Sequence, residues 1–353
     1  MSPQPVYWPD ALIDWSTGLF VARGADASIA ATVARILVEG DLLGHDTHGL
    51  ALLGPYLRKI DEGVLKPSGM YETVSDRPAA LLWDGGGLPG PWLTAEAVAQ
   101  AGARAKDTGT ATITIRRSGH IACLAAYLEA PARAGLVIEI FSSDPSVASV
   151  APFGGTRAAF TPNPIGIALP TSGDPILIDI STSITTNGMS ARLQAAGKRF
   201  PGNWLLDNRG RPTDDPDIFD TDPPGTIQLL GGRDAGHKGF GLTLLVEAMT
   251  GGLAGYGRAE APTDWGATVM VRATDPAAFG GLAGFNHELD WLVAACRDNP
   301  PVDPSRPVRL PGQRGLALKR DALANGLALN PLVHDAIARL AEETGITLPA
   351  PIS

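Results

Sequence analysis

The sequence has little of what marks secreted or membrane proteins. Cysteine occurs only twice in 353 residues, at Cys123 and Cys296, so at most one disulfide could form. No uninterrupted apolar stretch reaches the roughly 18 residues that a membrane-spanning helix needs, and no secretory signal pattern is present at the start. We therefore expect a protein of the reduced cytoplasm without contact with a membrane.

Runs of basic residues are also missing. Lys and Arg number 28 against 37 Asp and Glu, which gives a formal net charge of -9. An acidic chain without a cluster of Lys and Arg offers no surface for the phosphates of a nucleic acid, so we expect a small-molecule partner instead. Apolar residues make up 44% and charged residues 18% of the chain, as in ordinary globular proteins. The length suits two domains or one elaborated domain.

Several catalytic motifs are absent as well. The G-x-S-x-G elbow of the α/β-hydrolases does not occur, and Lys238 is not followed by the Ser or Thr of a Walker A loop. His45 and His48 are three residues apart, as paired metal ligands on a helix often are. No third ligand with a recognisable spacing accompanies them, so we predict no metal site.

The pattern of apolar residues predicts helices at both ends of the chain and a mixed α/β body between them. Helices are expected at 26–39, between Leu50 and Gly63 with a start made uncertain by Pro55, and at 331–343. Further helices are expected at 93–107, 121–134 and 239–250, and an ordered loop at 200–235. Strands are predicted at Ala80–Trp83, Ala111–Arg116, Leu136–Phe141, Ile165–Leu169, Ile176–Ile180 and Thr268–Val271.

His48 has the neighbours that a proton donor needs. Asp46 could orient or charge the imidazole, and Thr47 adds a hydroxyl for a substrate oxygen or nitrogen. If Asp46 or Thr47 caps the following helix, free backbone N–H groups there would favour a bound anion but would lower the pKa of His48. A structural histidine bonded to the backbone is the alternative, and the local sequence leaves both open.

Two glycine-rich stretches could hold a dinucleotide. Residues 85–90 match G-x-G-x-x-G after a strand, but Pro89 and Pro91 crowd the turn, and Arg116 and Arg117 end the next strand where an acidic residue is usual. A plain glycine turn is favoured. Residues 231–241 contain His237 and Lys238 ahead of an apolar helix, and there a phosphate-binding loop and an ordinary loop remain equally plausible.

Six motifs in order resemble the malate/L-lactate/sulfolactate dehydrogenase family, which also contains ureidoglycolate dehydrogenase, diketogulonate reductase and the piperideine/pyrroline-2-carboxylate reductases. The resemblance runs from Asp41 to about Gly326. The motifs are Asp46-Thr47-His48-Gly49, Ser118-Gly119-His120, Pro152-Phe153-Gly154-Gly155, Asn163-Pro164-Ile165, Asp179-Ile180-Ser181-Thr182-Ser183 and Gly236-His237-Lys238-Gly239-Phe240-Gly241-Leu242.

This resemblance implies an α/β, non-Rossmann NAD(P)-binding fold. A helical domain of residues 1–65 and 325–353 would join a largely antiparallel body of residues 66–324, and the protein would be a cytoplasmic homodimer. The cofactor would be NADP or NAD. His48 would donate the proton, with Asp46, Thr47 and His120 as its catalytic partners. Cofactor contacts would map to Ser143, Asp179, Ser181, Thr182, Ser183, His237, Lys238, Gly312 and Gln313.

The sequence departs from the family mainly at substrate positions. Leu52 stands where an Arg usually holds the substrate carboxylate, Met189 where a Lys is common, and Gln313 where a Glu is usual. Substrate contacts are predicted at Leu52, Tyr56 and Arg117. Either another group, such as Arg116 or Arg117, anchors the carboxylate, or the substrate is unusual. We predict a reductase of a 2-oxo acid or cyclic 2-imino acid. The alternative is a dinucleotide-binding relative with lost or altered catalysis.

Overall fold

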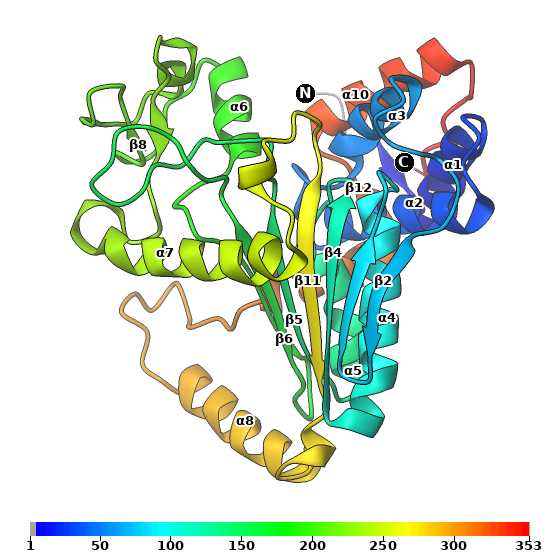
Figure 1. Ribbon diagram of the computed structural model, residues 1–353, viewed down its shortest axis with the longest axis vertical. Helices are drawn as coiled ribbons and strands as arrows, with labels where there is room; N and C mark the ends of the chain where they lie inside the picture. Colours follow the sequence, from blue (N-terminus) through cyan, green and yellow to red (C-terminus); the bar gives the residue numbers. More distant parts are fainter. Residues whose placement is uncertain (1–4, 353) are drawn as a thin grey trace.

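A computed structural model describes residues 5–352 and places a seven-stranded mixed sheet at the centre of the molecule (Figure 1). Five of these strands border only antiparallel neighbours, and β3 and β4 form the single parallel pair. The predicted mixed, largely antiparallel sheet is therefore confirmed. In spatial order the strands are β2 (Glu72–Arg77), β3 (Ala80–Asp84), β4 (Thr110–Ser118), β11 (Ala267–Thr274), β5 (Val137–Ser143), β6 (Pro164–Leu169) and β7 (Ile176–Ser181).

Both faces of the sheet are covered, because its central strands alternate buried side chains between two apolar clusters. On β11, Val269 and Val271 belong to the large core that α4 (Gly90–Thr108) covers. Met270 between them points to the other face, into a smaller cluster with Val246 of α7 (Gly232–Glu247). Helices α4 and α7 therefore lie on opposite faces of the sheet.

The two ends of the chain meet in one helical layer. Helices α1 (Pro9–Val21), α2 (Ala27–Leu42) and α3 (Leu53–Asp61) pack with α10 (Pro331–Thr344), and β1 (Val6–Tyr7) pairs with β12 (Leu327–Ala328). The Tyr7 hydroxyl lies 3.1 Å from Nε2 of His334. The predicted helical region built from both termini is therefore confirmed. Its apolar side chains share one core with the sheet, and the division into two domains stays a prediction.

A smaller lobe, at the left in Figure 1, is built by residues 187–231. It contains α6 (Asn187–Ala195) and a three-stranded sheet of β8 (Leu205–Leu206), β9 (Pro212–Thr213) and β10 (Thr226–Ile227). Its own apolar cluster includes Phe200, Leu205 and Ile227. The prediction of a loop at 200–235 was therefore incomplete, because two-residue strands are too short to give a period-two pattern.

Other boundaries also differ from the prediction. In place of the helix expected at 121–134, the structure has a 3-10 turn, η2 (Leu124–Tyr127), followed by the short helix α5 (Glu129–Arg133). Pro131 cannot occupy the interior of one long helix, and Gly135 follows the end of α5. Helix α7 begins seven residues before the expected 239. Four α-helices, strand β2 and the two-residue strands were not predicted; the helices are α1, α6, α8 (Leu282–Arg297) and α9 (Gln313–Asn325).

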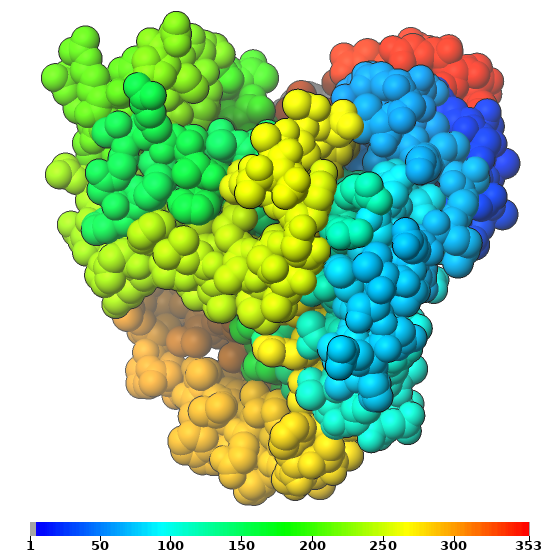
Figure 2. All heavy atoms as spheres, viewed as in Figure 1, coloured from blue at the N-terminus to red at the C-terminus, as the bar shows by residue number. Residues whose placement is uncertain are grey.

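Helix α8 lies at the lower edge of the molecule, and Figure 2 shows a hollow between it and the chain above. None of its residues is buried, and even the large apolar side chains of Trp291 and Leu292 are 65% and 49% exposed. Within residues 5–352, no helix combines the length and apolar character needed to cross a bilayer.

Candidate active site

The turn that carries His48 joins α2 to the 3-10 helix η1 (Leu50–Leu52) and is closed by its own backbone. The His45 amide donates to the Gly40 carbonyl at 2.8 Å, and the His48 amide donates to the His45 carbonyl at 2.8 Å. These bonds fix the direction in which the imidazole leaves the chain.

A buried carboxyl group lies beneath this turn. Oδ2 of Asp41 accepts the Leu50 amide at 2.7 Å, so Asp41, and neither Asp46 nor Thr47, bonds the first amide of the following helix. Burial raises the pKa of Asp41 to about 8. A Cβ at Gly49 would lie 2.4 Å from Oδ2 of Asp41, which explains why glycine follows the histidine.

Thr47, rather than Asp46, contacts the His48 ring. The Thr47 hydroxyl lies 2.8 Å from Nδ1 of His48. The Asp46 carboxylate instead accepts bonds from Nη1 of Arg192 at 2.9 Å and from Nδ2 of Asn330 at 2.7 Å. Asp46 therefore ties the turn to α6 and to the start of α10, while Nε2 of His48 has no protein partner among the hydrogen bonds of residues 5–352.

The surroundings of His48 favour its neutral form. Burial lowers the pKa of His48, the Asp179 carboxylate opposes this shift, and the neighbouring His45 and Arg192 add to it. Gly188 at the start of α6 lies beside the same ring, since a Cβ there would be 3.8 Å from Cε1 of His48 and 3.6 Å from Cβ of Thr47.

His120 stacks near His48, with 6.0 Å between ring centroids, and more closely on Trp265, at 4.6 Å and 19°. Its Nδ1 accepts the Ala122 amide at 3.2 Å, so the ring proton is assigned to Nε2. The Tyr56 hydroxyl donates to the His120 carbonyl at 2.8 Å. Burial lowers the pKa of His120 to about 3, and His48 contributes to the shift.

The structure thus brings together four of the predicted residues: Thr47, His48, Tyr56 and His120. Sequence reasoning missed Trp265, Arg192 and Asn330, whose positions carry no motif that marks them. Leu52 lies half-buried in η1 and packs against the main core. Met189, on α6, packs against the cluster of the smaller lobe.

The predicted replacement anchors are engaged elsewhere. Nε of Arg116 lies 2.8 Å from Oδ2 of buried Asp84, and Nε of Arg117 lies 2.7 Å from its Oδ1. Both guanidinium groups lower the pKa of Asp84, against the effect of its burial. Among the hydrogen bonds of residues 5–352, none joins either arginine to Thr47, His48 or His120.

The dinucleotide motifs converge on Thr182. Its amide donates to the Pro162 carbonyl at 2.9 Å, its carbonyl accepts the Leu230 amide at 2.9 Å, and its hydroxyl accepts from Thr243 at 2.8 Å. Three segments that are far apart in the sequence, around Asn163, Asp179 and Gly239, therefore lie side by side. The side chains of Thr182 and Ser183 are buried and donate to backbone carbonyls, as does half-buried Ser181.

The glycines of residues 231–241 begin helix α7 and do not form a free loop. A Cβ at Gly239 would lie 2.5 Å from the Leu230 carbonyl, so this glycine allows close packing. His237 and Lys238 are exposed on the first turns. The start of the helix opens onto a cleft lined by Phe153, Gly154, Gly155, Gly232 and Arg233 among others. Free N–H groups and an arginine there fit the phosphates of a dinucleotide.

The stretch at 85–90 does not offer such an end. A Cβ at Gly90 would lie 2.1 Å from the Gly119 carbonyl and 2.4 Å from the His120 carbonyl, so backbone already covers the start of α4. The interpretation as a plain glycine turn is supported, and its last glycine lets the His120 segment approach.

Two remaining groups of predicted cofactor residues lie in different surroundings. Ser143 is buried, and its hydroxyl donates to Glu247 at 3.0 Å within a network that includes Asn163 and Arg258. Gly312 lines a second cleft with Asp179 and His45. Beside it, Oε1 of Gln313 accepts the Leu310 amide at 3.2 Å.

Comparisons with known proteins agree on one relationship. The family described as malate/L-lactate dehydrogenase matches residues 8–338. The L-lactate dehydrogenase of Cupriavidus necator is 30% identical over 94% of this chain and 95% of that protein. The (2R)-3-sulfolactate dehydrogenase (NADP(+)) of Chromohalobacter salexigens is 33% identical over 83% and 85%, respectively. The crystal structure of malate dehydrogenase from Entamoeba histolytica, 21% identical, covers 98% of this chain and 100% of that chain with a TM-score of 0.91, a likeness of fold.

Proposed function

Because the chain belongs to the malate/L-lactate dehydrogenase family, we propose that it is an NAD(P)-dependent oxidoreductase that reduces a 2-oxo acid or a cyclic 2-imino acid. In reverse it oxidises the 2-hydroxy acid or the amino acid. The observation that carries this proposal is the pairing of His48, whose Nε2 is free, with neutral His120 at 6.0 Å between ring centroids.

The two histidines have different roles in this mechanism. His48 gives its proton to the carbonyl oxygen or imine nitrogen during reduction and takes it back during oxidation, while Thr47 holds Nδ1. His120 stays neutral, since its pKa is about 3, and donates a hydrogen bond from Nε2 to the substrate. Trp265 and Tyr56 keep the His120 ring in place.

A bound nicotinamide dinucleotide supplies the hydride. Candidate residues to hold it are Asp179 and Gly312 in one cleft and Arg233, with the exposed His237 and Lys238, at the start of α7. The name of the Chromohalobacter salexigens relative specifies NADP(+), and both NADPH and NADH are candidates for this chain.

The substrate side favours an unusual acid. Leu52 takes the place of the usual arginine, and Arg117 is bound to Asp84, so neither position supplies a free cation for a substrate carboxylate. We infer a substrate that presents an apolar or uncharged group to Leu52.

The proposal includes a homodimer. An unburied helix with exposed Trp291 and Leu292 needs a second surface to cover it, and a second copy provides one. The chemistry of the site itself involves a small molecule, in agreement with the acidic net charge of -9.

The decisive experiment is a dehydrogenase assay over a panel of 2-oxo and cyclic 2-imino acids with NADPH and NADH. Turnover of at least one member is expected, and His48→Ala should lower kcat by roughly 100-fold or more while the cofactor still binds. Near-normal turnover of the variant would remove His48 from this role. Thermal stabilisation by NAD(P)H without oxidation of any acid would favour the relative with lost catalysis.

A further inference from the structure

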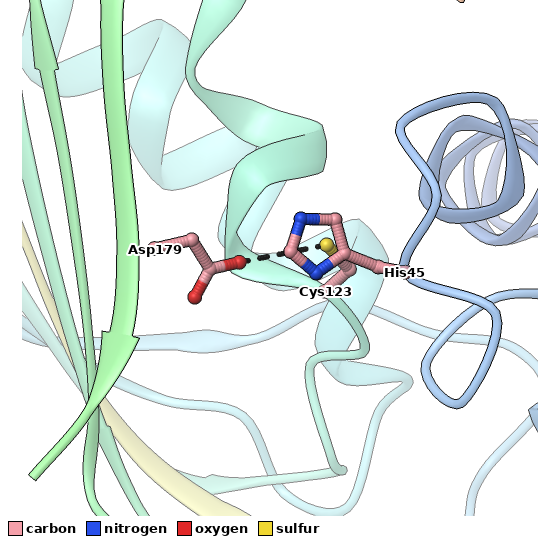
Figure 3. Close-up of side chains that lie close together, drawn as sticks. All are labelled: His45, Cys123 and Asp179. Carbon is pink, nitrogen blue, oxygen red and sulfur yellow. Dashed lines mark hydrogen bonds between the residues drawn. The ribbon is translucent and has the colours of Figure 1, made fainter. Parts of the chain in front are cut away.

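Three metal-ligating side chains converge beside the predicted active site. His45 follows α2, Cys123 precedes η2 and Asp179 lies on β7, and Figure 3 shows their side chains directed toward one another. Their nitrogen, sulfur and oxygen donors all lie within 4.8 Å of one another. The sequence predicted no metal site, because no third ligand with a recognisable spacing accompanies His45 and His48. In the structure, Cys123 and Asp179, which are far away in the sequence, lie close to His45.

The three groups are held by the backbone around them. Oδ2 of Asp179 accepts the Ala125 amide at 2.9 Å and lies 3.6 Å from Sγ of Cys123. The amide of His45 is fixed by the Gly40 carbonyl at 2.8 Å. The half-buried His45 and Asp179 line a cleft, while Cys123 is buried beneath, so an ion could enter from the cleft and reach all three.

This geometry is close to that of a tetrahedral zinc site. With bonds of about 2.0–2.3 Å, tetrahedral ligands lie roughly 3.4–3.6 Å apart. The Cys123–Asp179 separation of 3.6 Å already fits, and His45 needs a movement of about 1 Å or a change of side-chain rotamer. Sulfur, imidazole and carboxylate together select zinc over magnesium or calcium.

Charge also favours a dication. One thiolate and one carboxylate neutralise Zn²⁺, whereas Arg309 and Arg314, which line the same cleft, would oppose an uncompensated cation. The thiol of Cys123 loses its proton to the buffer when the sulfur–zinc bond forms, and no electron is transferred.

We propose that His45, Cys123 and Asp179 form a Zn²⁺ site with one open position, and that its occupancy inhibits the enzyme. Inhibition follows because the Asp179 carboxylate acts electrostatically on His48 and is one of the predicted cofactor contacts. A carboxylate bound to zinc can no longer stabilise the protonated His48 or contact the cofactor. The inhibition rests on the proposed function, but the binding of the metal does not.

Binding is tested with Co²⁺ as the probe, through the near-ultraviolet band that a thiolate gives on cobalt, and with Zn²⁺ in competition. We expect one equivalent bound by the purified full chain and affinity weakened at least about tenfold by Cys123→Ala. The matched control is Cys296→Ala, which removes an exposed thiol on α8. His45→Gln is the second variant should Cys123→Ala fail to fold by circular dichroism. No thiolate band, or a band lost in Cys296→Ala and kept in Cys123→Ala, overturns the site.

Inhibition is tested by titrating zinc during turnover. Wild type and Cys296→Ala should lose activity together and regain it with a chelator, while Cys123→Ala keeps its activity at zinc concentrations about tenfold higher. Zinc that binds at Cys123 without slowing turnover overturns the inhibitory role. A wild type that turns over no acid of the panel overturns the proposed function instead, while the cobalt experiment still decides the metal site.

Discussion

His48 lies in surroundings that favour its neutral form, and this gives the pH dependence of catalysis a direction. Burial holds the pKa of His48 below its ordinary value of 6.5, with Asp179 opposing the shift. Oxidation needs the neutral base, so its kcat/KM should fall only as the pH drops through the lowered pKa. Reduction needs the imidazolium, so its kcat/KM should fall as the pH rises through the same value.

The measurement is the pair of kcat/KM profiles, which report ionisation of the free enzyme. His48→Ala is the control, because its residual activity should lack this ionisation. A common midpoint above 6.5 would contradict the effect of burial.

A substitution at Leu52 tests whether the pocket has only lost its carboxylate-binding arginine or accepts a different substrate. A bidentate arginine–carboxylate contact contributes on the order of 1.5–3 kcal/mol. If the pocket had only lost its arginine, Leu52→Arg would lower KM for simple 2-oxo acids by roughly 10- to 100-fold. We expect the other outcome: activity on the best substrate falls sharply and simple acids gain little, because the half-buried position packs against the core and would hold an unpaired guanidinium.

Steady-state kinetics of Leu52→Arg on the best substrate and on pyruvate decide between these outcomes. Leu52→Met is the control, since it keeps the volume and apolar character of the position. A clear KM drop for pyruvate with undiminished activity on the best substrate would refute an apolar contact at this site.

At the scale of elements, the packing of helix α7 requires glycine at position 239 but not at position 241. A Cβ at Gly239 would lie 2.5 Å from the Leu230 carbonyl, whereas nothing lies within 4 Å of the position at Gly241. Gly239→Ala should therefore push α7 away from the segment that carries Thr182 and lower both the melting temperature and the affinity for NAD(P)H. Gly241→Ala should raise stability by about 1 kcal/mol at most, because alanine favours helices.

Thermal melts with and without NAD(P)H test the pair. Equal melting temperatures for the two variants would mean that α7 can move away from Leu230 without a loss of stability.

Local patterns predicted elements where apolar residues repeat at the spacing of a helix or a strand. The segment 26–39 repeats apolar residues at helical spacing and became α2, and residues 111–116 alternate and became part of β4. Helix α6 escaped prediction because its sequence, Asn187–Ala195, has little amphipathic pattern. In β2, every side chain is exposed, so no alternation marks it.

The candidate site divides in the same way. Thr47, His48 and His120 stand in short motifs, which a sequence can show. The partners of these residues come from segments far away in the chain: Asp46 bonds to Arg192 and Asn330, and His120 stacks on Trp265. Such contacts depend on tertiary packing, and no spacing within one segment predicts them. The same reason hid the approach of His45 to Cys123 and Asp179.

At the scale of the whole molecule, α8 is the feature that a single copy leaves incomplete. A helix of 16 residues that buries none of them has little to stabilise it in water. Burying a large apolar side chain contributes about 1.5–3 kcal/mol. Both Trp291 and Leu292 of α8 are exposed and could be buried in this way by a second copy.

We therefore expect light scattering after size exclusion to give twice the chain mass of 36.6 kDa. Trp291→Asp should shift the protein toward the monomer, because a carboxylate would have to be buried unpaired at the interface. Glu288→Gln, on the same helix and exposed, is the matched control and should stay dimeric. A wild type that is monomeric at every concentration, yet fully active, would show that α8 is stable without a partner.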